Sequence, residues 1–246
     1  MFLPISDDNP HGKFPVVNYL LIISCIVVFV WEVSLPTHQA LEAAIYKFGV
    51  VPSDLIKTQP FVMPRPFEML TIFTSMFMHG GWMHLLGNML FLWIFGDNIG
   101  ASMGSFRYLI FYLLCGVAAA LTQSFSAPDS IIPMIGASGA ISGILGAYFV
   151  LHPLANVRVL VWFIIFVTVW HIPAFLVLGF WFAAQFISSR QVDPGEPGIA
   201  FMAHIGGFVA GAVLVWFFKK KTVHAFAPAE SRAFSVEKRR IHKPQM

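Results

Sequence analysis

Long apolar stretches, separated by short polar or proline-containing segments, dominate the chain. A helix needs about 20 predominantly apolar residues to cross the ~30 Å hydrocarbon core of a bilayer. Six stretches approach or reach that length and predict membrane-spanning helices. They cover residues 16–33, 81–99, 106–125, 137–151, 172–188 and 199–218.

Two further stretches are apolar but do not fit a simple span. Residues 34–78 carry repeated Phe and Met residues, which is unusual for a solvated loop, and prolines interrupt them too often for a spanning helix. We expect this long first loop to be embedded in the membrane. Residues 157–169 precede Pro173 and would reach only ~20 Å as a helix. We therefore expect them to form a re-entrant or interfacial piece.

The ends of the chain are polar. The predicted organisation is an N-terminal segment (1–14), a membrane domain (15–218) and a basic tail (219–246) that we expect to be disordered. Six spans place both termini on one side. Eleven of the fifteen Lys and Arg residues then share that side, so the positive-inside rule makes it cytoplasmic.

The amino-acid composition narrows the class of protein to which the chain can belong. Apolar residues make up 57% of the chain and charged residues 11%, with a mean hydropathy of +0.75. Soluble domains carry roughly 25% charged residues, so a soluble enzyme is excluded, as are a disordered chain and a collagen-like rod. The net charge of +3 is too small to indicate nucleic-acid binding. The predicted fold is therefore an all-α, polytopic membrane protein.

A few polar side chains interrupt the spans, where each is energetically costly and requires a reason. In the six-span arrangement the second, fourth and sixth spans all begin at the outer face. Four of the polar residues lie within ~10 Å of those helix starts, so we expect them to line one outward-facing polar cavity. These four residues are His84, Asn88, Ser138 and His204.

Ser138 lies in the sequence Gly136-Ala137-Ser138-Gly139 at a predicted helix start. Free backbone N–H groups and the positive end of the helix dipole lie there, as a serine nucleophile with an oxyanion hole requires. The alternative is helix packing, because Gly139 and Gly143 form a GxxxG pair. Taken alone, the motif favours packing.

His204 suits the role of a general base, or that of an interhelical hydrogen-bond partner. Ala203, Gly207 and Gly211 form a small-residue face that would press the last span against the fourth and bring His204 beside Ser138. His84 and Asn88 are four residues apart and share a helix face. They could stabilise an oxyanion or form a polar contact between helices, whereas a structural role is expected for His79.

We expect neither a carboxylate side chain nor a metal ion beside these four polar residues. None of the twelve carboxylates falls near the polar positions of the second, fourth and sixth spans, so catalysis would use a Ser–His dyad. His79 and His84 are five residues apart and off a common helix face, and no HExxH sequence occurs. We therefore expect no metal and no cofactor, and we expect Cys25 and Cys115 to be buried thiols.

Taken together, the motifs resemble the rhomboid family of intramembrane serine proteases. The resemblance covers roughly residues 14–218, and its three pieces occur in the order and spacing of that family. The pieces are His79-Gly80-Gly81-Trp82-Met83-His84-Leu85-Leu86-Gly87-Asn88, Gly136-Ala137-Ser138-Gly139 and Ala203-His204-Ile205-Gly206-Gly207.

The resemblance implies a role for each motif residue. Ser138 would be the nucleophile and His204 the general base, while His84, Asn88 and the Ser138 backbone N–H would form the oxyanion hole. Gly136 would shape the preceding turn. Transmembrane proteins would be the substrates, cleaved near their outer ends, and membrane lipids the surroundings. The span 172–188 and the loop 191–199 would gate entry.

Two departures from the family pattern matter. A Trp-Arg pair that many members carry in the first loop is absent, which leaves the anchoring of that loop open. Some members also stack a tyrosine, four residues after the nucleophile, on the catalytic histidine. Here that residue is Ser142, so His204 must be held in another way, by Tyr148 or by a helix contact.

Two other functions compete with proteolysis. One is an inactive rhomboid-like protein that binds transmembrane helices as a chaperone or retention factor. The presence of both Ser138 and His204 argues against it. The other is a small transporter, which would need polar groups at inner depths as well, and the second, fourth and sixth spans have few.

Overall fold

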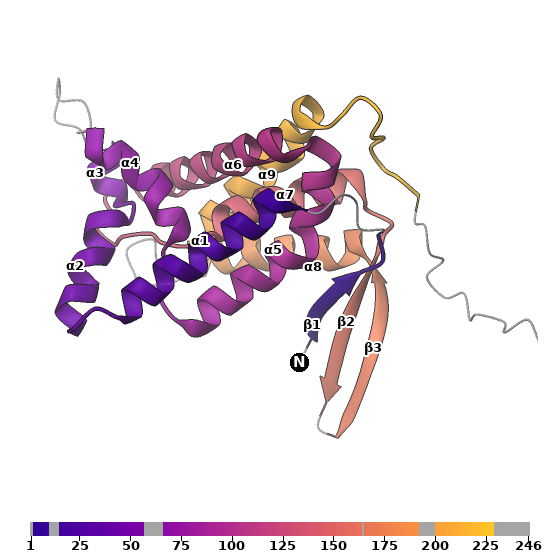
Figure 1. Ribbon diagram of the computed structural model, residues 1–246, viewed down its shortest axis with the longest axis horizontal. Coiled ribbons are helices and arrows are strands. Elements are labelled where there is room, and N and C mark those ends of the chain that lie inside the picture. The colour runs from indigo at the N-terminus through magenta and orange to yellow at the C-terminus, as the bar shows by residue number, and fades with distance from the viewer. Residues whose placement is uncertain (1, 10–14, 57–65, 164, 192–199, 229–246) are drawn as a thin grey trace, which may run out of the picture.

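The structure is a computed structural model that describes residues 2–9, 15–56, 66–163, 165–191 and 200–228. Six of its helices correspond to the six predicted spans and pack side by side (Figure 1). They are α1 (Val16–Val33), α5 (Trp82–Met103), α6 (Ser105–Ser126), α7 (Ser138–Leu151), α8 (Ala174–Ser189) and α9 (Phe201–Phe218). The protein is a polytopic, mostly helical membrane protein, as predicted.

The six helices differ in how well each alone would cross a bilayer. By length and composition α1, α6 and α9 are long and apolar enough. Helix α5 has 22 residues, but polar side chains such as Asn88 and Asn98 interrupt it. Helices α7 and α8 are shorter, with 14 and 16 residues. The polar functional candidates thus lie on helices of both kinds: on α5 and α7, and also on the long, apolar α9.

Helix α7 lies at the centre of the bundle, and twelve of its fourteen residues are buried. It contacts α9 backbone to backbone, because a Cβ atom at Gly207 would overlap the carbonyl oxygen of Gly139, and one at Gly211 that of Gly143. The predicted small-residue contact between the fourth and sixth spans is therefore confirmed. Close approach of these two helices determines the distance between the residues at their N-termini.

The first loop contains short helices rather than a span. These are α2 (His38–Phe48), α3 (Pro52–Ile56), α4 (Pro66–Thr74) and the 3₁₀ turn η1 (Ser75–Phe77), grouped at one end of the bundle (Figure 1). Val50 and Met134 exchange backbone hydrogen bonds of 3.0 and 2.7 Å, and the Gly136 N–H donates to the Ser75 carbonyl at 2.8 Å. The loop is thus bonded to the segment that precedes Ser138.

A small antiparallel sheet was not expected. Its strands β1 (Phe2–Asp7), β2 (Asn156–Phe163) and β3 (Phe166–Pro173) pair in that order (Figure 1). The short apolar piece at residues 157–169, expected to be re-entrant or interfacial and measured as a helix, belongs instead to the β-hairpin of β2 and β3. Alternating β-branched residues such as Val157, Val159 and Val161 favour a strand, but in an apolar run they are hard to tell from a buried helix.

The far end of the bundle from Ser138 is closed by polar contacts. Buried Asp7, at the end of β1, accepts hydrogen bonds from the Tyr148 hydroxyl of α7 and from Asn98 Nδ2 of α5, the latter at 2.7 Å. The first ten residues of the predicted tail are also attached here, because Phe226 and Ala227 donate N–H groups to the end of α7. Residues 229–246 of that tail lie outside the described residues.

Candidate active site

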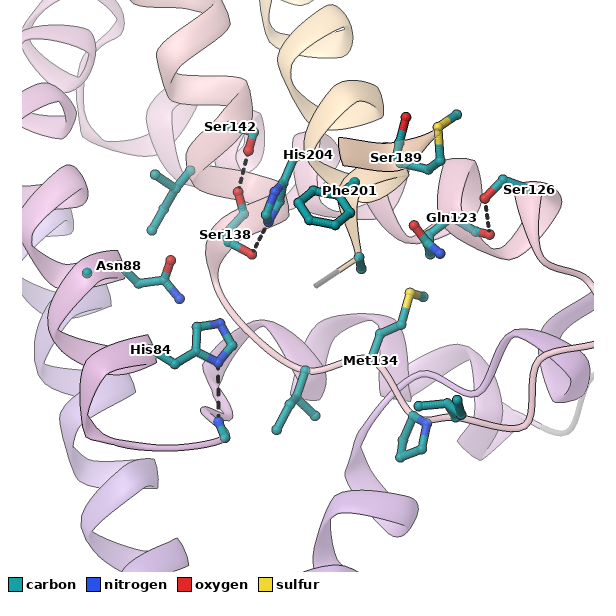
Figure 2. Close-up of a pocket in the computed structure, with 18 of the residues that line it drawn as sticks. His84, Asn88, Gln123, Ser126, Met134, Ser138, Ser142, Ser189, Phe201 and His204 are labelled. Carbon is teal, nitrogen blue, oxygen red and sulfur yellow. Dashed lines mark hydrogen bonds between the residues drawn. The ribbon is translucent and has the colours of Figure 1, made fainter. Parts of the chain in front are cut away.

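Ser138 and His204 meet at the N-terminal ends of α7 and α9. The Ser138 hydroxyl oxygen lies 2.8 Å from Nε2 of His204 (Figure 2). Ser138 is the first residue of α7, and His204 lies in the first turn of α9. The glycine contacts between the two helices bring these turns together. The geometry is that of a nucleophile beside a base.

His204 is held by helix α8. Its Nδ1 lies 2.7 Å from Oε1 of Gln185, and the ring of Trp181 lies 5.8 Å from the imidazole, inclined by 37°. Tyr148, suggested above as a possible support, is at the other end of α7 and bonds Asp7 instead. The alternative, a helix contact, is the arrangement found. The Ser142 hydroxyl donates to the Ser138 carbonyl at 2.6 Å.

His84 and Asn88 face Ser138 from α5, across the cavity (Figure 2). Nδ1 of His84 accepts the Gly80 N–H at 3.3 Å, so in the neutral ring Nε2 carries the proton and is a donor. Nδ2 of Asn88 is buried and has no hydrogen-bond partner among the described residues. An unpaired buried donor is costly, and a ligand oxygen would satisfy it.

The predicted glycines act differently from each other. Gly136 has φ +129°, and a Cβ atom there would lie 2.7 Å from Nε2 of His84, so both its backbone and its surroundings require glycine. It therefore shapes the turn before Ser138. At Gly139 a Cβ atom would lie 2.6 Å from that of Ala119, so this glycine serves packing against α6.

His79 lies next to His84 and supports it. It is buried, its Nδ1 lies 3.2 Å from the Phe77 carbonyl, and its ring contacts that of His84 edge-on at 5.2 Å. Burial, helped by the neighbouring His84, lowers the pKa of His79 to about 4, so the ring is neutral at pH 7. Its backbone N–H donates to the Glu32 carboxylate at 3.1 Å. Glu32 thus anchors the start of the first motif, which begins at His79.

A cavity of about 880 Å³ joins these groups. Its lining includes His84, Asn88, Ser138 and His204, and elsewhere both apolar residues such as Met134 and Phe201 and further polar ones such as Gln123 (Figure 2). No Asp or Glu belongs to its described lining. No cluster of three metal-ligating side chains occurs in the described part of the chain. The loop 191–199 lies largely outside the described residues.

Gln185 and Trp181 were not among the residues predicted from the sequence. Gln185 is the one polar side chain in the apolar run 174–187. Like His84, Asn88, Ser138 and His204, it is a polar side chain within a span, where such a group is costly, and this signal was present in the sequence. Gln123 was also missed, and its Oε1 accepts the Ala203 N–H at 3.2 Å beside the base.

Comparison with known proteins places the chain in a family. A family model described as the Rhomboid domain matches residues 66–221. The chain is 28% identical over 157 residues to Rhomboid-like protein 11, chloroplastic, of Arabidopsis thaliana, covering 60% of this chain and 51% of that protein. Rhomboid-like protease 5 of Toxoplasma gondii is 33% identical over 165 residues, which is 65% of this chain and 17% of that one. Rhomboid protease GluP of Bacillus subtilis is 31% identical over 137 residues, or 56% and 24%. The chain spans about half the length, or less, of these relatives.

Proposed function

Because the chain belongs to the rhomboid family, we propose that it is an intramembrane serine endopeptidase that cleaves membrane proteins in or near their transmembrane segments. The observation that carries the proposal is the 2.8 Å contact between the Ser138 hydroxyl and Nε2 of His204 at the edge of a cavity. Helix packing alone would not require a hydroxyl, an imidazole and an unpaired amide donor to face one cavity.

The first half of the reaction forms an acyl-enzyme. Oγ of Ser138 attacks the carbonyl carbon of the scissile bond while Nε2 of His204 takes the hydroxyl proton. The tetrahedral intermediate then collapses, its C–N bond breaks, and His204 gives the proton to the leaving amine. The carboxyl part of the substrate stays esterified to Ser138.

The negative oxygen of the tetrahedral intermediate requires donors that are already in place. Nδ2 of Asn88, Nε2 of His84 and the backbone N–H of Ser138 supply them. Asn88 is buried without a partner, and His84 is held in the donating tautomer by Gly80. Neither donor must break another bond before it binds the oxygen, which is how preorganised donors accelerate acyl transfer.

The second half of the reaction needs water. His204 takes a proton from a water molecule that attacks the ester, and returns it to Ser138 as the acyl group leaves. A site near one membrane surface, rather than at the mid-plane, is accessible to water. We place the cavity toward the outer leaflet and both termini in the cytoplasm, with residues 15–218 as the membrane domain.

The decisive experiment is cleavage of a model transmembrane substrate by the purified protein in detergent. Wild type is expected to cleave, and Ser138→Ala to lose activity by ~10⁴-fold or more, because the remaining donors and binding contribute only part of the rate. Equal cleavage by both proteins would refute the proposal. Binding of transmembrane helices without cleavage would support the inactive, helix-binding alternative instead. Labelling of Ser138 by a fluorophosphonate would support the nucleophile assignment.

A further inference from the structure

Two side chains of α8 hold the histidine base. Gln185 Oε1 lies 2.7 Å from Nδ1 of His204, and the Trp181 ring covers the imidazole at a centroid distance of 5.8 Å. Residues four apart project from the same face of a helix, so Trp181 and Gln185 act from one side. One ring face and one ring nitrogen of the base therefore depend on a single helix, which is neither the helix of the base nor that of the nucleophile.

The Gln185 contact has a consequence for the proton on His204. To receive the Ser138 proton, Nε2 must be unprotonated, so Nδ1 must carry the ring hydrogen. The carbonyl oxygen of Gln185 accepts a hydrogen bond and cannot donate one. The contact thus selects the tautomer that the reaction requires and aims Nε2 at Ser138. An uncharged amide achieves this without the cost of placing a carboxylate within a membrane domain.

Helix α8 is also the most weakly buried of the four helices that bear site residues. Only Ala174 and Leu178 of its sixteen residues are buried, against twelve of fourteen in α7, ten of twenty-two in α5 and six of eighteen in α9. Beside the His204 contacts, its site half is attached to α9 by Trp181 and Phe182, which pack on Phe208. Elements with few buried contacts separate locally at low free-energy cost.

We infer that Gln185 is a positioning residue that selects the tautomer of His204, and that docking of α8 on α9 thereby controls whether the base is aligned. The inference rests on the proposed proteolytic function. With α8 docked, Nδ1–H is bound and Nε2 faces Ser138. With α8 displaced, the ring loses its Nδ1 acceptor and the Trp181 contact but keeps its contacts with Ser138 and Phe201, and both tautomers become accessible. The control acts on the chemical step and not on substrate affinity.

The first test is kinetic. Gln185→Met keeps the length of the side chain but removes the acceptor, so kcat is expected to fall about ten- to thirty-fold with KM unchanged. Gln185→Glu keeps an acceptor, and its kcat at neutral pH is expected to stay within about threefold of wild type. Its negative charge favours the protonated ring, so the acid limb of the pH–kcat profile is expected at higher pH. An unchanged kcat in Gln185→Met, or an unshifted limb in Gln185→Glu, would overturn the inference.

A matched control and a coupling measurement exclude a general structural effect. Gln39→Met makes the same change at an exposed site on α2 and is expected to behave as wild type. Trp181→Leu is expected to lower kcat, and its effect should not add to that of Gln185→Met, because both changes free the same ring. Additive effects, or an equal loss in Gln39→Met, would count against a shared action on His204.

A spectroscopic test separates this inference from the proteolytic proposal. The ¹⁵N resonances of His204, assigned by their loss in His204→Gln, report the tautomer directly. They are expected to show Nδ1–H in wild type and in Ser138→Ala, and a mixture in Gln185→Met. An Nε2–H tautomer in wild type would overturn the inference even if the protein cleaves substrate. If the protein does not cleave substrate but gives the expected spectra, the proposed function is refuted, whereas the role of Gln185 still holds.

Discussion

The two ends of α7 are built in opposite ways. At the Ser138 end, a cavity separates α7 from α5, and the buried Asn88 amide faces it with an unused donor. At the other end the Tyr148 hydroxyl and Asn98 amide both donate to buried Asp7, and Asn9 donates to the Tyr148 hydroxyl at 2.7 Å. At the first end the Asn88 donor stays available, whereas the polar groups gathered around Asp7 at the other end pair with one another.

The difference shows where this chain places its stability. Satisfied buried polar groups fix a unique arrangement, whereas an unpaired donor costs free energy unless a ligand binds it. The paired end joins the N-terminal strand to α5 and α7, and the glycine contacts with α9 continue that rigidity toward Ser138. The open end can then tolerate unpaired groups. Changes at the two ends are expected to separate activity from stability.

The largest expected effect is on activity at the open end. Asn88→Ala removes one oxyanion donor and is expected to lower kcat by about 10²- to 10³-fold, as the loss of such a donor does elsewhere. Its melting temperature is expected to stay equal or to rise, since a buried unpaired group is removed. The measurements are cleavage kinetics and thermal unfolding in detergent.

Asn98→Ala is the matched control on the same helix. It removes the 2.7 Å bond to Asp7, so it should lower the melting temperature and leave kcat per folded molecule near wild type. If Asn88→Ala unfolded more easily than Asn98→Ala, the contrast between the two ends would be lost.

A smaller effect is expected from Tyr148→Phe at the closed end. The ring still fills its place against Phe95, but the Asp7 carboxylate loses a donor. The free energy of unfolding is expected to drop by about 1–3 kcal/mol, the cost of leaving a buried group less satisfied. Cleavage at low temperature should remain within about twofold of wild type. A strong loss of kcat without loss of stability would show that the closed end takes part in the reaction.

The smallest expected effect is a change of folding stability with pH. His152, beside Tyr148 at the end of α7, has its pKa lowered by burial from 6.5 to about 4. Between those values the unfolded chain binds a proton that the folded chain does not, so this group reduces stability as the pH falls below 6.5. By pH 5.5 the loss is expected to be roughly 1 kcal/mol.

A His152→Asn variant tests this expectation, because it cannot bind the proton. Its melting temperature should depend less on pH between 7 and 5.5 than that of wild type. The same slope in both proteins would assign the acid sensitivity to other groups.

Much of the site followed from sequence because of one physical rule. A polar side chain in an apolar run is expensive, so Ser138, His204 and Asn88 stood out, and helix direction then placed them at one depth. The rule was applied only to three spans, which is why Gln185 was overlooked. The identity of the residue that holds the base depends on how α8 packs, and periodicity alone does not reveal that.

The unpredicted parts of the fold depend on distant pairing. Strand β1 was assigned from the sequence to a polar N-terminal segment, because its partner β2 lies some 150 residues away in the sequence. Asp7 and Tyr148, 141 residues apart, give no local sign of their contact. Apart from the pair Arg158 and His171, the hairpin of β2 and β3 is mostly apolar on both faces, so polar and apolar residues do not alternate along it as they do in a half-buried strand.

The bonds that join Val50 to Met134 and Ser75 to Gly136 bear on any attempt to transplant or shorten this protein. The conformation of the segment before Ser138 depends on backbone hydrogen bonds to residues that lie some sixty to eighty positions earlier in the sequence. A shortened protein made only of the six long helices would keep Ser138 and His204 but lose the hydrogen bonds that orient the segment before Ser138. Residues 38–77 therefore belong to the smallest unit that a designer should move.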